Sequence, residues 1–416
     1  MTTMATRTVQ ASRSGRPAGV RPTSSLGTRP LLRWGGVDWW LMAAVSGLLV
    51  LGTLLVWSAT TTRDDLTGGD PRAYLYKQVT NIAIGLVLMS VVLVADHRWV
   101  RVAAPLAYLA SVGGLVLVLV AGSTINGSRS WIVVGGMSIQ PAELAKLAVV
   151  IGMALVLAHR AAGRWRPRVG LVEVVLMLAI AAVPAVLILL QPDLGTMLVL
   201  TATVTGVLAV SGAPRRWLAL LAGGGVTAAL AAVAGGVLKP YQVDRFLAFT
   251  NPDLDPRGAG YNVEQARIAV GNGGVWGQGL FEGSQTRSGF VPEQHTDFVF
   301  TVAGEERGLV GAGLLIALLG LVVWRALVIA THTDDVFGRV AAAGIACWFG
   351  FQGFQNVGMC LGIMPVTGVP LPFVSYGGSS MFAGLVAVGL LQNIHLRATE
   401  PAPRRYSAPR VLVTAR

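Results

Sequence analysis

The chain of 416 residues is 53% hydrophobic and only 12% charged, with a mean hydropathy of +0.63. A water-soluble domain carries about twice that share of charged residues, so the composition excludes an ordinary soluble enzyme. The net charge of +12 follows the loops between apolar runs, which indicates membrane topology rather than a nucleic-acid partner.

Apolar runs close to 20 residues long recur along the chain, each long enough to cross a bilayer core of about 30 Å. Membrane β-strands need only about 9–11 residues, so the runs predict helices. The predicted spans are 39–59, 78–95, 102–121, 142–158, 171–190, 195–211, 217–238, 300–324, 338–360 and 381–396. We therefore predict an all-α polytopic membrane protein whose ten-helix domain occupies residues 39–396.

The placement of arginine predicts the orientation of these spans, because basic residues collect in cytoplasmic loops. The tail of residues 1–38 carries six arginines and one acid, and the tail of residues 397–416 carries five arginines. Basic residues then recur in alternate loops, at Arg98, Arg101, Arg160, Arg164, Arg166, Arg168, Arg215, Arg216, Arg325 and Arg339. We expect both tails to be disordered and cytoplasmic, and the remaining loops to face outward.

The first polar insertion on the predicted outer side is "QPAELAK", at the start of the fourth span. Glu143 and Lys146 are three residues apart, so their side chains share one face of a helix. Arg129 and Trp131 precede them in the loop. An ordinary ion pair between Glu143 and Lys146 explains the motif as well as a binding role does.

A second insertion, "QPDLGT", separates two apolar runs and places Asp193 on the outer side. The longest loop, residues 239–297, follows the seventh span and holds five basic and seven acidic residues. Long ordered loops tend to be functional. Its segment "YNVEQARIAV" predicts a short helix. "GNGGVWGQGL" matches neither a dinucleotide fingerprint nor a P-loop, so we expect its glycines to permit tight turns and close backbone approach.

The segment "FVPEQHTDFVFTVAGEERG" joins this loop to the eighth span. Asp297 lies where a helix begins, and a capping role for such a carboxylate is the alternative to a catalytic one. His295 has no second histidine or cysteine at metal-ligand spacing. Glu305 and Glu306 fall about two turns inside the span, where acids mark function or an ion pair; Arg307 beside them makes an internal ion pair the alternative.

The fourth insertion is the uncharged outer loop "MPVTGVPLPFVSYGGSS", which contains three prolines and the pair Ser375 and Tyr376. Irregular backbone at membrane depth must be held by protein or line a cavity. Together with the other three insertions, it predicts an outward-facing polar cavity inside a helix bundle.

These motifs, "QPAELAK", "QPDLGT", "HTDF" and "TGVPLPFVSYGGSS", resemble those of the RodA/FtsW/SpoVE family, the SEDS proteins, over residues from about 39 to 396. The resemblance implies ten transmembrane helices in the bacterial cytoplasmic membrane. It also implies polymerisation of peptidoglycan strands from lipid II, beside a class B penicillin-binding protein. "NPDLDPRGAGYN" and "GSQTRSGFVPEQHTDFVF" are more similar to the RodA branch (elongation) than to the FtsW branch (division). Further proteins of the elongation or division machinery are expected partners.

Carried over by position, the resemblance makes Glu143 and Lys146 the pair of the "QPAELAK" motif. This chain departs from many members in two places. Ala142 stands where they have serine, and the Arg–Trp pair often found upstream is separated here by Ser130, between Arg129 and Trp131. The second departure puts the role of Arg129 in doubt.

The resemblance implies that Asp297 is the essential acid, and the chemistry of glycosyl transfer agrees. Displacement with inversion needs a base for the acceptor hydroxyl and positive charge for the departing lipid diphosphate. In this hypothesis Asp297 is the base, Lys146 with Arg129 or Arg245 faces the diphosphate, and Glu143 orients Lys146. A helix N-terminus would lower the pKa of Asp297 and burial would raise it. The expected supporting residues are His295, Asp193, Trp131, Glu305, Ser375 and Tyr376.

A divalent cation, magnesium or manganese, is a further expectation, with Asp297 and Asp193 as its possible ligands; no organic cofactor is expected. Two other functions stay open. A transporter that flips the lipid-linked precursor would also have ten helices and broken segments, but no inverted repeat is visible and the polar residues gather on one side. A scaffold for the transpeptidase would not need Glu143, Lys146 and Asp297 together.

Overall fold

The structure is a computed structural model that describes residues 36–125, 128–134, 137–161, 169–236, 243, 245, 249 and 258–398. The predictions made for residues 1–35 and 399–416 lie outside these ranges. So do Arg164, Arg166 and Arg168, and much of the first part of the outer loop, including most of "NPDLDPRGAGYN".

Ten helices of 18 or more residues account for the ten predicted spans in the described part of the chain. They are α1 (Trp39–Thr61), α3 (Ala73–Val94), α4 (His97–Ala121), α5 (Pro141–Arg160), α6 (Leu171–Leu190), α7 (Leu194–Ser211), α8 (Arg215–Ala234), α12 (Val299–His332), α13 (Val336–Cys360) and α14 (Gly378–Ala398). The shorter helices are α2 (Asp64–Thr67), α10 (Ala259–Asn272) and α11 (Ser284–Ser288).

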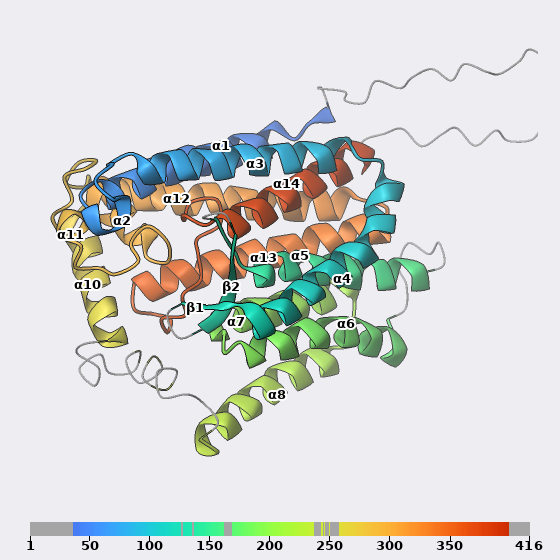
Figure 1. The fold of residues 1–416 in the computed structure, drawn as a ribbon. Helices are drawn as coiled ribbons and strands as arrows, with labels where there is room; N and C mark the ends of the chain where they lie inside the picture. The colour runs from blue at the N-terminus through green and yellow to red at the C-terminus, as the bar shows by residue number, and fades with distance from the viewer. Residues whose placement is uncertain are drawn as a thin grey trace, which may run out of the picture. The chain divides into compact units, whose positions relative to one another are not determined.

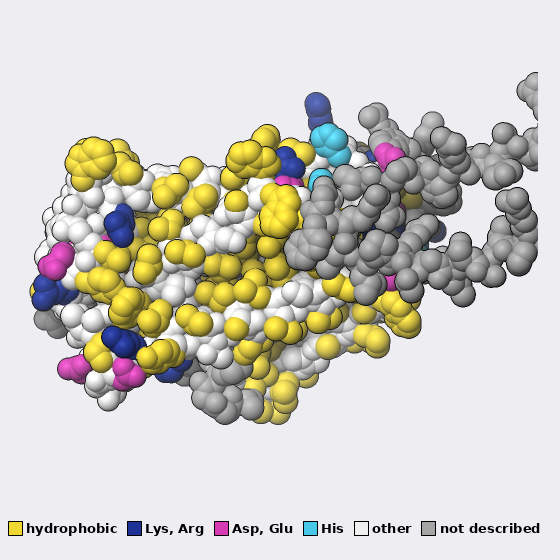
Figure 2. All heavy atoms as spheres, turned by 90° about the horizontal axis from the view of Figure 1, so that it is seen from above, with side chains coloured by type: hydrophobic (Ala, Val, Ile, Leu, Met, Phe, Trp, Pro, Cys, Tyr) yellow, Lys and Arg dark blue, Asp and Glu magenta, His cyan; other side chains and the backbone are white. Residues whose placement is uncertain are grey.

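Eight of the long helices are long and apolar enough to cross a membrane, and only α8 and α13 are not among them. Helix α13 is less apolar because it carries three buried amides, Gln352, Gln355 and Asn356. Hydrophobic side chains cover the middle of the face shown in Figure 2, and charged side chains gather toward its two ends. The prediction of a polytopic helical membrane protein is confirmed.

The long helices pack into one bundle whose interior is lined mainly by α5, α13 and α14 (Figure 1). Helix α14 lies against α3, α12 lies between α1 and α13, and α13 also packs on α5 and α7. Helix α8 packs only on α7 among the stronger helix contacts and leaves Leu220, Val226 and Leu230 exposed.

Several features differ from the sequence prediction, and helices α3 and α4, for example, each begin five residues before the predicted starts at 78 and 102. The loop between α4 and α5 forms a small antiparallel sheet of β1 (Ser123–Ile125), β2 (Ser128–Val134) and β3 (Met137–Ile139), in the order β1-β2-β3. Arg325, which was expected in a loop, lies inside helix α12, which continues to His332 instead of ending at 324. Its guanidinium instead pairs inside the bundle with Asp38, at 2.7 Å from Oδ2.

Helix α12 is interrupted at Gly308, whose φ of 63° and ψ of −162° are not helical. The glycine-rich stretch of the outer loop pairs with the backbone at this break. The Gln278 N–H donates to the Glu305 carbonyl at 2.9 Å, and the Leu309 N–H donates to the Gly274 carbonyl at 2.9 Å. The break therefore joins the outer loop to α12.

The expectation that these glycines allow close backbone approach is confirmed. A Cβ atom at Gly273 would lie 1.9 Å from the Gly304 carbonyl oxygen, and one at Gly277 would lie 2.2 Å from the Glu306 carbonyl oxygen. Real Cβ atoms do not approach so closely, so only glycine fits at both positions.

Gly277→Ala is expected to lower the stability of the purified protein by about 1–3 kcal/mol, because it adds a clash and strains a φ of +83°. Gly271→Ala is the matched control, since nothing lies within 4 Å of its Cβ position at the end of α10. Thermal unfolding in detergent should show a lower Tm for the first variant alone. Equal Tm values would contradict the close approach.

Candidate active site

Asp297 lies two residues before α12, in a turn that follows Glu293. The Asp297 N–H donates to the Glu293 carbonyl at 3.1 Å. The N-cap of α12 is Phe298, which has no capping side chain, and the described residues give the Asp297 carboxylate no hydrogen-bond donor. Capping therefore does not explain Asp297. The residue is partly exposed.

Desolvation is the main reason why the pKa of Asp297 is raised to about 7. The negative charges of Glu293 and Asp193 raise this pKa further, whereas the guanidinium of Arg245 lowers it. The sequence left open whether burial or a helix N-terminus would dominate, and in the structure burial does. A carboxylate with this pKa can accept a proton at neutral pH far better than an ordinary aspartate.

The loop between α13 and α14 passes beside this carboxylate. A Cβ atom at Gly368 would lie 3.2 Å from Asp297 Oδ2, and Gly368 has a φ of +70° that favours glycine. The amide of Asn356, in α13, donates to the Asp297 carbonyl at 2.7 Å. The outer loop, α13 and the α13–α14 loop thus meet at Asp297.

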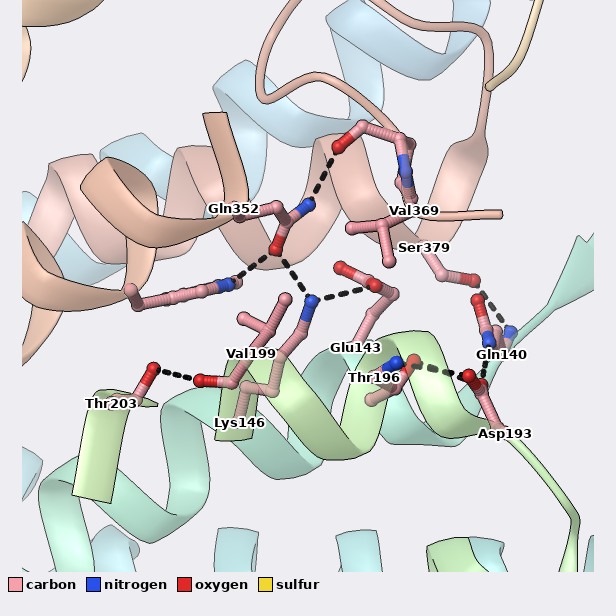
Figure 3. Close-up of polar contacts among 12 residues, drawn as sticks. Gln140, Glu143, Lys146, Asp193, Thr196, Val199, Thr203, Gln352, Val369 and Ser379 are labelled. Carbon is pink, nitrogen blue, oxygen red and sulfur yellow. Dashed lines mark hydrogen bonds and ion pairs between the residues drawn. The ribbon is translucent and has the colours of Figure 1, made fainter. Parts of the chain in front are cut away.

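Glu143 and Lys146 form the ion pair that was the alternative to a binding role, with Lys146 Nζ 2.7 Å from Glu143 Oε1 (Figure 3). Lys146 Nζ also donates to Gln352 Oε1 at 2.7 Å. The side chain of Lys146 is completely buried and Glu143 is 2% exposed. The ammonium faces its two partners rather than a cavity, so its contact with a diphosphate stays a prediction.

Asp193 caps α7 and ties it to the start of α5 (Figure 3). Its Oδ1 accepts the Thr196 N–H at 2.9 Å, and its Oδ2 accepts the Gln140 amide at 3.0 Å. The Gln140 N–H donates in turn to the Ser379 hydroxyl of α14 at 2.8 Å. The ends of α5, α7 and α14 next to Asp193 are therefore fixed to one another.

His295 packs its ring against two tyrosines, with centroids 5.0 Å from Tyr74 and 5.8 Å from Tyr376. Burial lowers the pKa of the His295 imidazole, so it is neutral at pH 7, and burial raises the pKa of Tyr376 to about 12. The Tyr376 N–H donates to the His295 carbonyl at 2.9 Å, and the Ser375 hydroxyl accepts the Leu371 N–H at 2.8 Å. These residues hold the α13–α14 loop beside the turn of Asp297.

Three of the residues expected in the site lie in other contacts. Arg129 is exposed on β2 and donates to the Val120 and Gly122 carbonyls at the end of α4. Trp131 is also on β2, opposite Ser123.

Glu305 accepts hydrogen bonds from the N-terminus of α11, including the Thr286 N–H at 2.9 Å. The neighbouring Glu306 accepts the Ser58 hydroxyl of α1. Among the described residues no ion pair joins Arg307 to either acid, so both carboxylates fasten the outer loop and α1 to α12 instead.

A pocket of about 210 Å³ opens between α3, β3 and the start of α14, with a lining of both polar and apolar residues. Its lining includes the polar side chains of Lys77, Thr80, Asn81, Ser138 and Tyr376. Lys77 is exposed, and its ammonium lies 4.6 Å from the centre of the Tyr74 ring. The sequence prediction missed Lys77 because it lies one residue before the expected start of the second span.

Asp297 and Asp193, the expected ligands of a divalent cation, are near enough for the charge of Asp193 to raise the pKa of Asp297, and their binding of an ion stays a prediction. Asp193 is committed to hydrogen bonds with Thr196 and Gln140. In the part of the chain that the structure describes, no three His, Cys, Asp or Glu side chains gather so that they could hold an ion.

A family model for FtsW, RodA and SpoVE, described as cell cycle proteins, matches residues 39–400. The chain belongs to the FtsW/RodA/SpoVE family. "Probable peptidoglycan glycosyltransferase FtsW" of Halothiobacillus neapolitanus is 36% identical over 383 residues, which cover 88% of each chain. "Peptidoglycan glycosyltransferase MrdB" of Escherichia coli K12 is 35% identical over 360 residues, covering 85% of this chain and 92% of that one.

Solved structures of the family agree with the fold. RodA of Thermus thermophilus has a TM-score of 0.64 at 33% identity, over 88% of this chain and 99% of its own. A chain from "Structural coordination of polymerization and crosslinking by a peptidoglycan synthase complex" has a TM-score of 0.72 at 34% identity, over 88% of this chain and 100% of its own.

Lys146→Met is expected to destabilise the protein by about 3–5 kcal/mol, because it leaves Glu143 charged, buried and unpaired. The double variant Glu143→Gln with Lys146→Met should recover much of that loss, since no charge is then buried. Unfolding of the wild type, both single variants and the double variant in detergent forms a double-mutant cycle. Additive losses would mean that the pair contributes nothing.

Proposed function

We propose that this chain is a peptidoglycan glycosyltransferase that polymerises lipid II into glycan strands. Its relatives carry that activity in their names. The observation that carries the proposal is Asp297, a partly exposed carboxylate with a pKa of about 7 at the point where the outer loop, α13 and the α13–α14 loop meet. Lipid II is the substrate that the family resemblance implies.

In the proposed reaction, Asp297 accepts the proton of the acceptor hydroxyl. The hydroxyl oxygen attacks the anomeric carbon of the growing chain as the bond to the lipid diphosphate breaks, so the configuration inverts. The bonding electrons leave with the diphosphate, whose negative charge needs a cation nearby. Glu143 and Lys146 act in this account through the α5–α13 contact that supports the site.

For the diphosphate we favour Lys77, with Arg245 as the second cation. Lys77 lines an open pocket whose Tyr376 joins it to the turn of Asp297, whereas Lys146 is fully enclosed. Arg245 acts electrostatically on Asp297. The pocket also offers the hydroxyls of Thr80 and Ser138 to a sugar or phosphate oxygen.

We further propose that the site faces outward from the bacterial cytoplasmic membrane, with both termini cytoplasmic. The arginine distribution supports this orientation. A class B penicillin-binding protein is the proposed partner, because a structural neighbour comes from a complex described as coordinating polymerization and crosslinking.

The proposed cellular role is RodA-like elongation, with FtsW-like division as the alternative. The relatives named FtsW and MrdB match this chain at nearly equal identity, so they do not distinguish the two roles. The choice of elongation rests on the two motifs of the outer loop that resemble the RodA branch. Expression in strains depleted of either polymerase tests it: restored rod shape supports elongation, and restored septation without rod shape supports division.

A divalent-ion requirement stays a prediction. Since no three His, Cys, Asp or Glu side chains gather among the described residues, we expect an ion to arrive with the diphosphate. Titrating chelated enzyme with magnesium or manganese measures the dependence.

Asp297→Asn should abolish glycan synthesis, because the amide cannot accept the proton. The assay uses purified protein with its transpeptidase partner, whose own active site is blocked, and labelled lipid II. Asp65→Asn, an exposed residue of the outer side, is the control that should polymerise normally. Strands made by Asp297→Asn would refute the catalytic role; movement of lipid II across vesicles without strands from the wild type would favour the flippase.

The rate of polymerisation should rise with pH through about 7, because only ionised Asp297 can act as base. At pH 6 the rate is expected to be about tenfold below its plateau. Glu293→Gln should move the midpoint to lower pH by removing a negative charge that raises the pKa of Asp297. A rate that is flat from pH 5 to 8 would show that Asp297 has an ordinary pKa or is not the base.

Lys77→Gln should raise KM for lipid II by about tenfold, the effect of losing one charged contact of about 1.4 kcal/mol. Arg72→Gln is the control, because Arg72 is an exposed cation at the same end of α3 that does not line the pocket. KM for lipid II is measured from Michaelis–Menten curves of both variants. An unchanged KM for Lys77→Gln would remove this pocket from the substrate path.

A further inference from the structure

Three amide side chains of α13 bind the loop that follows the helix. The donors and acceptors are Gln352 Nε2 to the Pro370 carbonyl (2.8 Å), Gln355 Nε2 to the Thr367 hydroxyl (2.6 Å) and Asn356 Nδ2 to the Val369 carbonyl (2.7 Å). All three side chains are at most 1% exposed. Residues 365–370 have no regular secondary structure of their own, so these donors fix their position.

Asn356 differs from the two glutamines because it also binds the turn of Asp297. Its Nδ2 donates to the Asp297 carbonyl at 2.7 Å as well as to the Val369 carbonyl. An amide NH₂ group has two hydrogens, so both are used. One side chain therefore holds two backbone segments that are more than 70 residues apart in the sequence.

The two segments that Asn356 joins lie next to each other at the carboxylate. Gly368 precedes Val369, and its missing Cβ leaves the space 3.2 Å from Asp297 Oδ2. The position of the Val369 carbonyl thus sets how closely backbone packs on the carboxylate, and close packing is what desolvates it.

We propose that Asn356 is a positioning residue for Asp297: a two-point clamp that fixes the carboxylate against the 367–370 segment. Asn356 does not touch the substrate in this account. The inference rests on the proposed catalytic role of Asp297 and adds to it the residue that holds the acid in place.

The alternative is that Asn356 only fastens a loop to a helix. Asn393 of α14 is such a fastener. It is 1% exposed, and its Nδ2 donates to the Val92, Leu93 and Ala95 carbonyls at 3.0, 3.1 and 2.8 Å. It is the same residue type with the same burial in another part of the bundle, which makes Asn393→Ala a matched control for Asn356→Ala.

Hydrogen–deuterium exchange tests the clamp without an activity assay. In the full-length protein, Asn356→Ala should accelerate exchange in peptides covering 293–298 and 366–374, whereas Asn393→Ala should leave both at the wild-type rate. Unchanged exchange of both peptides in Asn356→Ala would overturn the proposal.

Kinetics then separates positioning from general stability. With partner and lipid II, Asn356→Ala should lower kcat by at least about tenfold, which corresponds to about 1.4 kcal/mol, while KM changes less than about threefold. Asn356→Leu has nearly the same shape but no donor, so it should be equally slow.

Asn393→Ala should lower Tm and keep the wild-type kcat per folded molecule. Wild-type kcat in either Asn356 variant would show that donation is not needed and refute the clamp. Absence of strands from the wild type itself would refute the proposed function instead, and the exchange result would still stand.

Discussion

Hydrogen bonds buried inside an apolar bundle constrain everything else in this protein. In a hydrocarbon environment no water satisfies an unpaired ammonium or amide, so each must find a partner within the chain. Lys146 of α5 meets that requirement with Glu143 and with Gln352 of α13. The Gln352 amide also donates to the Pro370 carbonyl, which ties the α13–α14 loop to α13. The polar core therefore fixes helices and outer loops together.

The half of the bundle that holds Asp297 is built on that core. Gln140 and Asp193 tie the ends of α5 and α7, and Ser379 adds α14. The break of α12 at Gly308 lets the long outer loop dock its backbone on the helix, and Glu305 secures α11 there. The turn that contains Asp297 connects this docked loop to α12. Its carboxylate is desolvated by neighbouring backbone yet still accessible, which is the combination a base at neutral pH needs.

Hydropathy predicted the ten long helices because each apolar run is long enough to be unambiguous. The predicted end of α12 was wrong because Arg325 was assigned to a loop from its charge. Its guanidinium instead pairs with Asp38, and a single sequence does not show such a pair. The strands between α4 and α5 were missed because β1 and β3 have only three residues each, and the seven residues of β2 do not alternate between polar and apolar. At the site, Asp297 and the Glu143–Lys146 pair stood out as ionisable groups in apolar surroundings. Lys77 and Asn356 did not stand out, since their roles depend on which distant segments meet. For the same reason Arg129 was expected in the site, whereas it binds carbonyls at the end of α4.

The account depends on the Asp297 carboxyl having a pKa near neutrality in the folded protein. Infrared difference spectra of protein labelled with ¹³C-carboxyl aspartate measure this directly, with Asp297→Asn as the reference that removes the band of interest. We predict a protonated carboxyl band that belongs to Asp297 and disappears with a midpoint near pH 7. A midpoint near 4, the ordinary value for aspartate, would show that the surrounding segments do not desolvate the carboxylate, and the proposed base would lose its physical foundation.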